Sequence, residues 1–331
     1  MAQEATVPNA SLLNPKEAVI RPLNPLDPVR CTIMDTPDRS NRACSLDSLI
    51  GIDSYSASIA KATRIGLSVR GRGSAAVVSA GNRVLALASA QPRSGPGSWD
   101  ITHLYVSPAG EEHVAVLLSA ITQAAIEKRC QRIFLRLRQD DSLVDIARQG
   151  GFFPRVSETL YIGRPSSASG RSGSPNRNEP LSEEHPVDGH DLFRLFNAAT
   201  PSEIRQAVGM TMDQWASSRE RLNRRSGAYV MRRQDSAVGS VRTSRKFSKG
   251  WLEASAHPNN QRCMPTMVKF GLEKLESCKA VYCMMPDYQV DLRCILVDQG
   301  FEQAPEYITL VNTMTVKAID DIRLRSAVPI T

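Results

Sequence analysis

The chain has 331 residues, of which 41% are hydrophobic and 23% charged, and its formal net charge is +7 at pH 7. This length predicts about two domains, and the composition is that of an ordinary globular protein. No apolar run approaches the ~20 residues that cross a bilayer, and the first residues lack the basic and then apolar pattern of a secretory signal. We therefore expect a cytoplasmic protein without membrane contact.

The seven cysteines and five histidines are scattered along the chain, and no two cysteines have the C-x-x-C spacing of a metal or redox motif. Most of the cysteines lie in segments that we predict to be core helices or strands. A free cysteine in such a place behaves as a small apolar residue. We therefore expect neither a metal site nor a disulfide framework.

The first half begins with an arm, residues 1–17, that is rich in Pro, Asn and Ala and has no periodicity. A short strand is predicted from Ala18 to Leu23. Ser45 is a suitable N-cap for a helix that begins at Leu46, because a serine oxygen can accept a hydrogen bond from a free backbone N–H of the first turn.

A β-hairpin is the clearest local signal in the sequence. Two β-rich runs, Ala75–Ser79 and Val84–Ser89, are separated by the turn pair Gly81–Asn82. The segment Trp99–Val106 then predicts another strand.

After Pro108 the sequence predicts a helix, a strand and a second helix. Apolar residues recur at helical spacing from Glu111 to Arg129. The strand RIFLRLR follows, in which Ile133, Leu135 and Leu137 share one face and Phe134 lies on the other. The helix Ser142–Gln149 is predicted to end at Gly150–Gly151, a natural C-cap.

The second half repeats this plan. Both Trp99–Tyr161 and Trp251–Tyr307 read strand, helix, strand, helix, Gly-Phe and strand. The spacing from Pro108 to Gly151 is nearly the same as the spacing between the corresponding proline and glycine of the second copy. Residues 164–186, rich in Ser, Gly and Pro, are predicted to link the copies. A period this long indicates two copies of one domain rather than a solenoid.

The order of the elements resembles the GNAT superfamily of N-acetyltransferases. The stretches that carry the resemblance are IRPL at Ile20–Leu23, LYVSP at Leu104–Pro108, the GFF and Leu-Tyr strand at Gly151–Tyr161, ASAHP at Ala254–Pro258 and DQGFE at Asp298–Glu302.

This resemblance implies an α+β fold of two tandem GNAT-like domains, residues 18–163 and 187–317, followed by a tail, residues 318–331. Each domain would have its own mixed, largely antiparallel twisted sheet flanked by helices.

The resemblance also implies a site for acetyl-CoA. In this family the cofactor lies between two central strands, and backbone amides at the start of the following helix hold its pyrophosphate. The family signature there is Arg or Gln, two residues, Gly, one residue, and Gly or Ala.

The first copy has Glu111, Val114 and Val116 at these positions. The carboxylates of Glu111 and Glu112 would repel phosphate.

The second copy is the better candidate for the cofactor. Its signature positions hold Gln261, Met264 and Thr266, so the glutamine is kept and both glycines are missing. Arg262 adds positive charge. We therefore predict that acetyl-CoA, if it binds, contacts Gln261, Arg262, Cys263 and Met264.

The catalytic residues implied by the resemblance are partly absent. The helix tyrosine of many family members is replaced by Ala147 and Leu296. Glu253, on the strand before the second loop, could take the proton of an amine. Tyr288 could stand in as the acid.

Two functions remain open on this basis. The first is an acyl-CoA-dependent N-acyltransferase of GNAT type, in particular an N-acetyltransferase, with degenerate CoA loops. The alternative is a noncatalytic pseudo-acetyltransferase that acts as a structural or regulatory subunit.

The basic run at 219–249 suggests a further alternative. It holds ten basic residues and only Glu220 and Asp235 as acids. Such a run is usually a solvated face, but this run or the N-terminal arm could contact a protein partner, and the run could bind nucleic acid. Aromatic residues are sparse there, so nucleic-acid binding would depend on the phosphate backbone and on salt.

Overall fold

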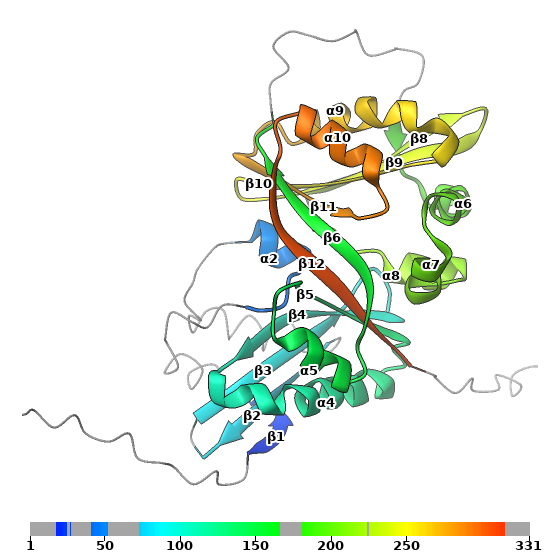
Figure 1. Ribbon diagram of the computed structural model, residues 1–331. Helices are drawn as coiled ribbons and strands as arrows, with labels where there is room; N and C mark the ends of the chain where they lie inside the picture. Colours follow the sequence, from blue (N-terminus) through cyan, green and yellow to red (C-terminus); the bar gives the residue numbers. More distant parts are fainter. Residues whose placement is uncertain are drawn as a thin grey trace, which may run out of the picture.

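The computed structural model describes residues 18–24, 27, 41–51, 73–81, 83–165, 181–223 and 225–314. The predicted arm 1–17, the linker from 166 to 180 and the tail 318–331 lie outside the described residues. Two units follow each other along the chain (Figure 1).

The elements of the first unit are β1 (Val19–Pro22), α2 (Leu46–Ile50), β2 (Ser74–Ala80), β3 (Arg83–Pro92), β4 (Ser98–Val106), η1 (Pro108–His113), α4 (Val114–Glu127), β5 (Arg132–Arg138), α5 (Leu143–Gln149) and β6 (Phe153–Gly163).

The elements of the second unit are β7 (Leu181–Glu183), η2 (Pro186–Asp188), α6 (Gly189–Ala199), α7 (Ser202–Val208), α8 (Met212–Ser218), β8 (Ser226–Arg233), β9 (Ser236–Lys246), β10 (Lys249–Ala256), η3 (Pro258–Cys263), α9 (Met264–Lys274), β11 (Ala280–Pro286), α10 (Val290–Asp298) and β12 (Glu302–Thr313).

Several elements confirm local sequence signals. Ser45 caps α2 in a capping box, because its side chain accepts from Ser48 N–H and the Ser48 hydroxyl accepts from Ser45 N–H. Strands β2 and β3 form the predicted hairpin. Gly151 and Gly300, which follow α5 and α10, have φ of +84° and +79°. This left-handed conformation favours glycine and ends both helices at equivalent places.

The last residues of the predicted linker belong to a strand. Leu181–Glu183 forms β7, an edge strand that pairs antiparallel with β8, Leu181 opposite Met231. The ordered second unit therefore begins at Leu181 rather than at 187, because backbone pairing with β8 fixes this stretch.

The sheets of the two units are continuous, whereas we expected a separate sheet in each domain. All strands belong to one 12-stranded sheet in the order β1-β2-β3-β4-β5-β12-β6-β11-β10-β9-β8-β7. The last strand of each unit inserts beside a strand of the other: β12 pairs with β5 and with β6, and β6 also pairs with β11. In Figure 1, β6 and β12 run side by side from one unit to the other.

This exchange is reciprocal, because each unit gives its last strand to the other. The order of the strands is therefore approximately twofold symmetric about the pair β12 and β6. The exchange also covers the strand edges that β5 and β11 would otherwise expose. The units therefore cannot separate without breaking the ladder between β6 and β12.

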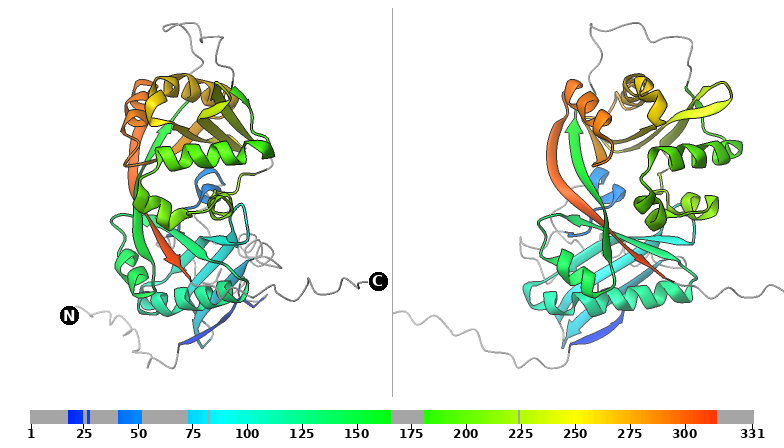
Figure 2. Two further views of the ribbon diagram at one scale, coloured as in Figure 1. Left: turned by 90° about the vertical axis from the view of Figure 1, so that its right-hand side faces the viewer. Right: turned by 45° about the vertical axis from the view of Figure 1, so that its right-hand side comes forward.

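Each unit keeps its own hydrophobic core. One core gathers β2–β5 with α4 and α5, and the other gathers β9–β11 with α9 and α10. Ile133, Leu135 and Leu137 lie in the first core and Phe134 in a small cluster on the opposite face, as the alternation of β5 predicted. Helices α2 and α6–α8 lie between the two ends of the molecule (Figure 2).

No helix in the described ranges is long and apolar enough to cross a membrane.

Candidate functional site

In each unit two central parallel strands pair only at their first residues. Ser98–Asp100 of β4 pairs with β5, and Lys249–Trp251 of β10 pairs with β11. Beyond these positions the strands are not paired with each other. We call the residues beyond the pairing the first wedge (101–106 of β4 with 135–138 of β5) and the second wedge (252–256 of β10 with 283–286 of β11).

The first wedge is filled by the chain itself. The Asn41 side chain accepts from Leu104 N–H (2.8 Å) and donates to Thr102 C=O (2.9 Å) of β4. Arg42 N–H donates to Leu104 C=O (2.9 Å), and Cys44 N–H donates to Arg136 C=O (2.8 Å) of β5. Residues 41–44 therefore connect the two unpaired strands.

We call the end of each wedge, where the helix after the first strand begins, its head. The head of the first wedge is also closed to a phosphate group. Ser107 N–H and its hydroxyl both donate to the carbonyl of Leu85 on β3. A Cβ at Gly110 would lie 2.4 Å from that carbonyl oxygen, so this turn is held against β3. Glu111 and Glu112 follow directly, and two carboxylates at a helix start disfavour an anion.

The second wedge differs because several backbone groups of β10 are available. Backbone groups of β10 alternate between the two neighbouring strands. His257 N–H donates to Val238 of β9, and the Ser248 carbonyl accepts from Ala280 at the start of β11. Residues 252, 254 and 256 therefore direct their backbone groups into the wedge. Within the described part of the chain, no other segment makes a backbone hydrogen bond to them there.

The predicted cofactor residues lie at the head of this second wedge, in η3 and the first turn of α9. The Gln261 side chain donates to Ala256 C=O at 3.4 Å. Arg262 is exposed. The side chains of Cys263 and Met264 are buried in the core of the second unit, so of these two residues only the backbone amides could meet a ligand.

The two predicted catalytic residues lie on the side of the second wedge that faces the first unit. Leu252 and Ala254 pack into the core against α9, whereas Trp251 belongs to a cluster with α2 residues. Glu253 shares the face of Trp251, because side chains alternate along a strand. Its carboxylate forms an ion pair of 3.0 Å with Arg242.

Tyr288 follows β11 and lies near Glu253. Burial raises the pKa of Tyr288 to about 12, with further contributions from the charges of Glu158 and Glu253 and an opposing one from a hydrogen bond with Thr200. The hydroxyl therefore keeps its proton at neutral pH and can act as a hydrogen-bond donor.

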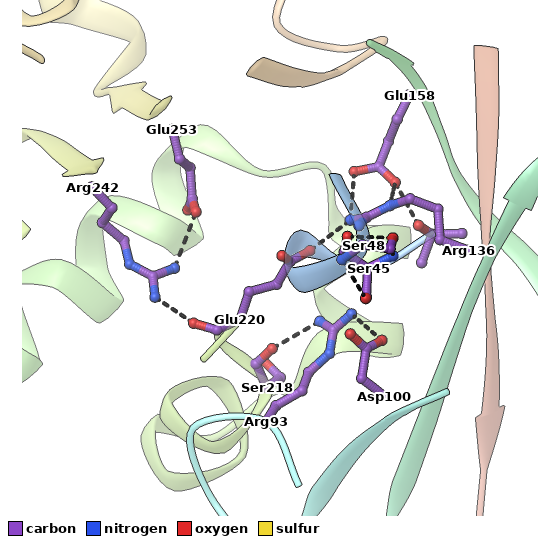
Figure 3. Close-up of polar contacts among 11 residues, drawn as sticks. Ser45, Ser48, Arg93, Asp100, Arg136, Glu158, Ser218, Glu220, Arg242 and Glu253 are labelled. Atoms are coloured by element: carbon purple, nitrogen blue, oxygen red, sulfur yellow. Dashed lines mark hydrogen bonds and ion pairs between the residues drawn. The ribbon is translucent and has the colours of Figure 1, made fainter. Parts of the chain in front are cut away.

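A buried charged cluster between the two units was not predicted (Figure 3). Arg136 of β5 donates to Glu158 of β6 (2.7 Å) and to Glu220, which follows α8 (2.7 Å). Arg93 donates to Asp100 (3.1 Å) and to Ser218 C=O (2.9 Å).

This charged cluster has strong effects on its members. Burial raises the pKa of Asp100, against the opposing charge of Arg93. Burial acts in the same direction on Glu220, but the positive charges of Arg136 and Arg93 outweigh it and the pKa of Glu220 is lowered. The sequence signal was an arginine within the apolar strand RIFLRLR, but its partners are distant in sequence.

Several basic residues of the run at 219–249 have partners within the protein. Arg242 is buried beside Glu253, and Arg219 forms an ion pair with Glu184. Other members bind within the fold: Arg232 pairs with Asp188, Lys246 with Asp47, and Arg245 donates to Ser277. Much of this positive charge is therefore balanced inside the protein. Among the residues that the structure describes, no group of His, Cys, Asp and Glu side chains could hold a metal ion.

No protein-family model and no curated protein matches the sequence. The structure is similar to a GCN5-related N-acetyltransferase from Sphaerobacter thermophilus, with a TM-score of 0.54 and 15% identity, covering 89% of this chain and 95% of that one. It is also similar to a tandem GNAT protein from the clavulanic acid biosynthesis pathway, with a TM-score of 0.51 and 13% identity, covering 90% and 98% of the two chains. The chain therefore has the fold of the tandem GNAT N-acetyltransferases.

Proposed function

We propose that the protein is an acyl-CoA-dependent N-acyltransferase, most simply an N-acetyltransferase, whose acyl donor binds in the second unit. One observation carries this proposal. Among the described residues, the second wedge keeps the C=O of Leu252, both backbone groups of Ala254 and the N–H of Ala256 available, whereas residues 41–44 bind those of Thr102 and Leu104 in the first wedge. Such backbone groups can pair with the amides of an extended ligand.

The head of the second wedge fits the phosphates of CoA in part. The exposed Arg262 and the start of α9 provide positive charge. Pro265 removes one amide of the first turn, and the signature glycines are missing. Contact would therefore depend on Arg262, the Gln261 amide and the remaining backbone N–H groups.

The chemistry requires an amine to lose a proton and a thiolate to be stabilised. Acyl-CoA supplies the acyl group as a thioester. Glu253 would accept the proton of the amine as its nitrogen bonds to the acyl carbon and the carbon–sulfur bond breaks. Tyr288, which stays protonated, would donate a hydrogen bond to the departing sulfur.

A noncatalytic role is the second candidate, and specific features favour it. The carboxylate of Glu253 is engaged by Arg242. Cys263 and Met264 have core side chains where the family has a glycine-rich loop. On this alternative, the two-unit body would serve as a structural or regulatory subunit, and acetyl-CoA would not bind.

A transfer assay separates the two candidates. The full chain is incubated with acetyl-CoA and a panel of primary amines, and acetylated products are measured by mass spectrometry. We expect product with the wild type and a decrease in kcat of about 100-fold for Glu253→Gln, because a general base contributes at least that much.

Glu302→Gln is the matched control, since Glu302 is exposed at the start of β12, and it should leave kcat unchanged. Equal activity of Glu253→Gln and wild type would remove Glu253 from the mechanism. No product with any amine would favour the noncatalytic role.

A further inference from the structure

We propose that the first wedge is a peptide-binding slot and that residues 41–44 of the same chain are its ligand. This inference rests on the contacts of residues 41–44 and does not depend on the proposed activity.

The backbone of the segment, which bends at Ala43, contacts both strands of the wedge. Arg42 N–H binds β4 and Cys44 N–H binds β5, so one segment satisfies both strands that diverge at the wedge. The neighbouring side chains Ala43 and Cys44 are buried in different clusters, Ala43 in the first core and Cys44 with α2 residues. The bend is held by the Asn41 side chain, which accepts from Ala43 N–H. The segment therefore supplies backbone donors to carbonyls that the two strands leave unpaired, and buried backbone groups need such partners.

The contacts also select the sequence of the ligand. Asn41 accepts from Leu104 N–H and donates to Thr102 C=O through two separate atoms of its amide, and alanine can do neither. Arg42 binds Asp141 with two hydrogen bonds, one of them 2.6 Å from Nε, and this forked pairing is specific to arginine. Ala43 and Cys44 are small enough to fit at 2% and 7% exposure.

The same segment reaches the second unit. Immediately after Cys44, helix α2 places Leu46 and Ile50 in a cluster with Trp251 and Met284. Asp47 forms an ion pair of 3.0 Å with Lys246. The bound segment therefore connects the first wedge to the sheet of the second unit, and an acyl donor could enter the first wedge only by displacing it.

Cys44 reports whether the segment is bound. Burial raises the pKa of Cys44 to about 12 and that of Cys130 to about 11, so both thiols should react slowly with iodoacetamide in the folded protein. Cys130 lies in the first core and not in the segment. Its labelling therefore measures unfolding of the unit, whereas that of Cys44 also measures release of the segment.

The first experiment compares the labelling rates of both thiols by peptide mapping, without acetyl-CoA. The double variant Asn41→Ala, Arg42→Ala should label Cys44 about tenfold faster or more, because local opening then costs less free energy, while Cys130 stays protected. The single variant Arg42→Ala should show a smaller change in the same direction and serves if the double variant does not fold. Unchanged protection of Cys44 in the variants would overturn the proposal.

The second experiment tests the slot directly. A fluorescent peptide with the sequence of residues 41–51 should bind the double variant saturably and should not bind the wild type, whose slot is filled. The same peptide carrying both alanines is the matched control and should not bind either protein. Equal binding to wild type and variant, or binding to neither, would contradict the proposal. So would faster labelling of Cys44 in the wild type at saturating acetyl-CoA.

Discussion

Arg136 joins the two units through two carboxylates. It binds Glu158 of its own unit and Glu220 of the other, and the hydroxyl of Thr309 on β12 donates to the same Glu158. A buried charge that loses its partner costs about 3–5 kcal/mol. The cluster therefore favours one arrangement of β5, β6, β12 and the segment after α8 over others.

Glu220 and Asp100 should affect acid stability in opposite directions. The pKa of Glu220 is below its usual 4.5 in the folded chain, so its stabilising contribution is complete above about pH 4.5 and is lost as the pH falls through the folded-state pKa. The pKa of Asp100 is above its usual 3.8. Protonation of Asp100 on acidification, down to about pH 3.8, therefore adds stability.

We predict that Glu220→Gln flattens the decrease in the free energy of unfolding on acidification and that Asp100→Asn steepens it. The measurement is urea unfolding at a series of pH values from about 6 to about 3. Identical slopes for the two variants would contradict the assigned directions.

Residue-level prediction from sequence succeeded where the signal was local. The cap at Ser45 and the left-handed Gly151 depend on neighbours within a few positions. The partners of Arg136 could not be predicted, because Glu220 is brought to it by the exchange of strands between the units. The partners of Arg219 and Arg242 were missed for another reason. Glu184 and Glu253 lie in the same unit but 35 and 11 positions away in the sequence, so the run appeared to be a free basic surface.

At the level of elements, the order of strands and helices was predicted well and their pairing was not. Sequence periodicity identifies strands such as β6 and β12. The alternation of apolar and polar residues along each strand would be the same whichever unit the strand joined, so it does not predict the partner. The exchange of strands between the units depends on the pairing of β6 with β12, from Glu302 opposite Ile162 to Val311 opposite Phe153. Pairing between two strands that lie this far apart in the sequence leaves no local signal from which it could be predicted.

The turn before β12 gives a prediction for this level. Gly300 has φ of +79°, and a Cβ there would meet no atom within 4 Å. We expect Gly300→Ala to lower the free energy of unfolding by about 1 kcal/mol, because alanine is strained in this conformation and nothing else changes.

The matched control is Gly189→Ala. Gly189 has φ of −52° and equally free space, so alanine should be neutral or stabilising by up to about 1 kcal/mol. Both values follow from thermal or urea unfolding. A destabilisation by Gly189→Ala equal to that by Gly300→Ala would argue against the conformational explanation.

For the whole molecule, the structure describes two units of one plan that have diverged in their wedges. The first is occupied by residues 41–44 and has acids at its head, and the second has free backbone groups and Arg262 at its head. The sequence indicated the same asymmetry through Glu111 and Gln261, but it could not indicate that Asn41 and its neighbours fill the first wedge.

The proposed function therefore predicts one acyl donor for each chain. Titration calorimetry with acetyl-CoA should give a stoichiometry of one for the wild type. Arg262→Glu should weaken binding about tenfold, since it replaces a phosphate contact with repulsion. Arg293→Glu, the same change at an exposed residue of α10, should not alter it. Absence of binding, or two molecules bound per chain, would contradict the assignment of a single donor site to the second unit.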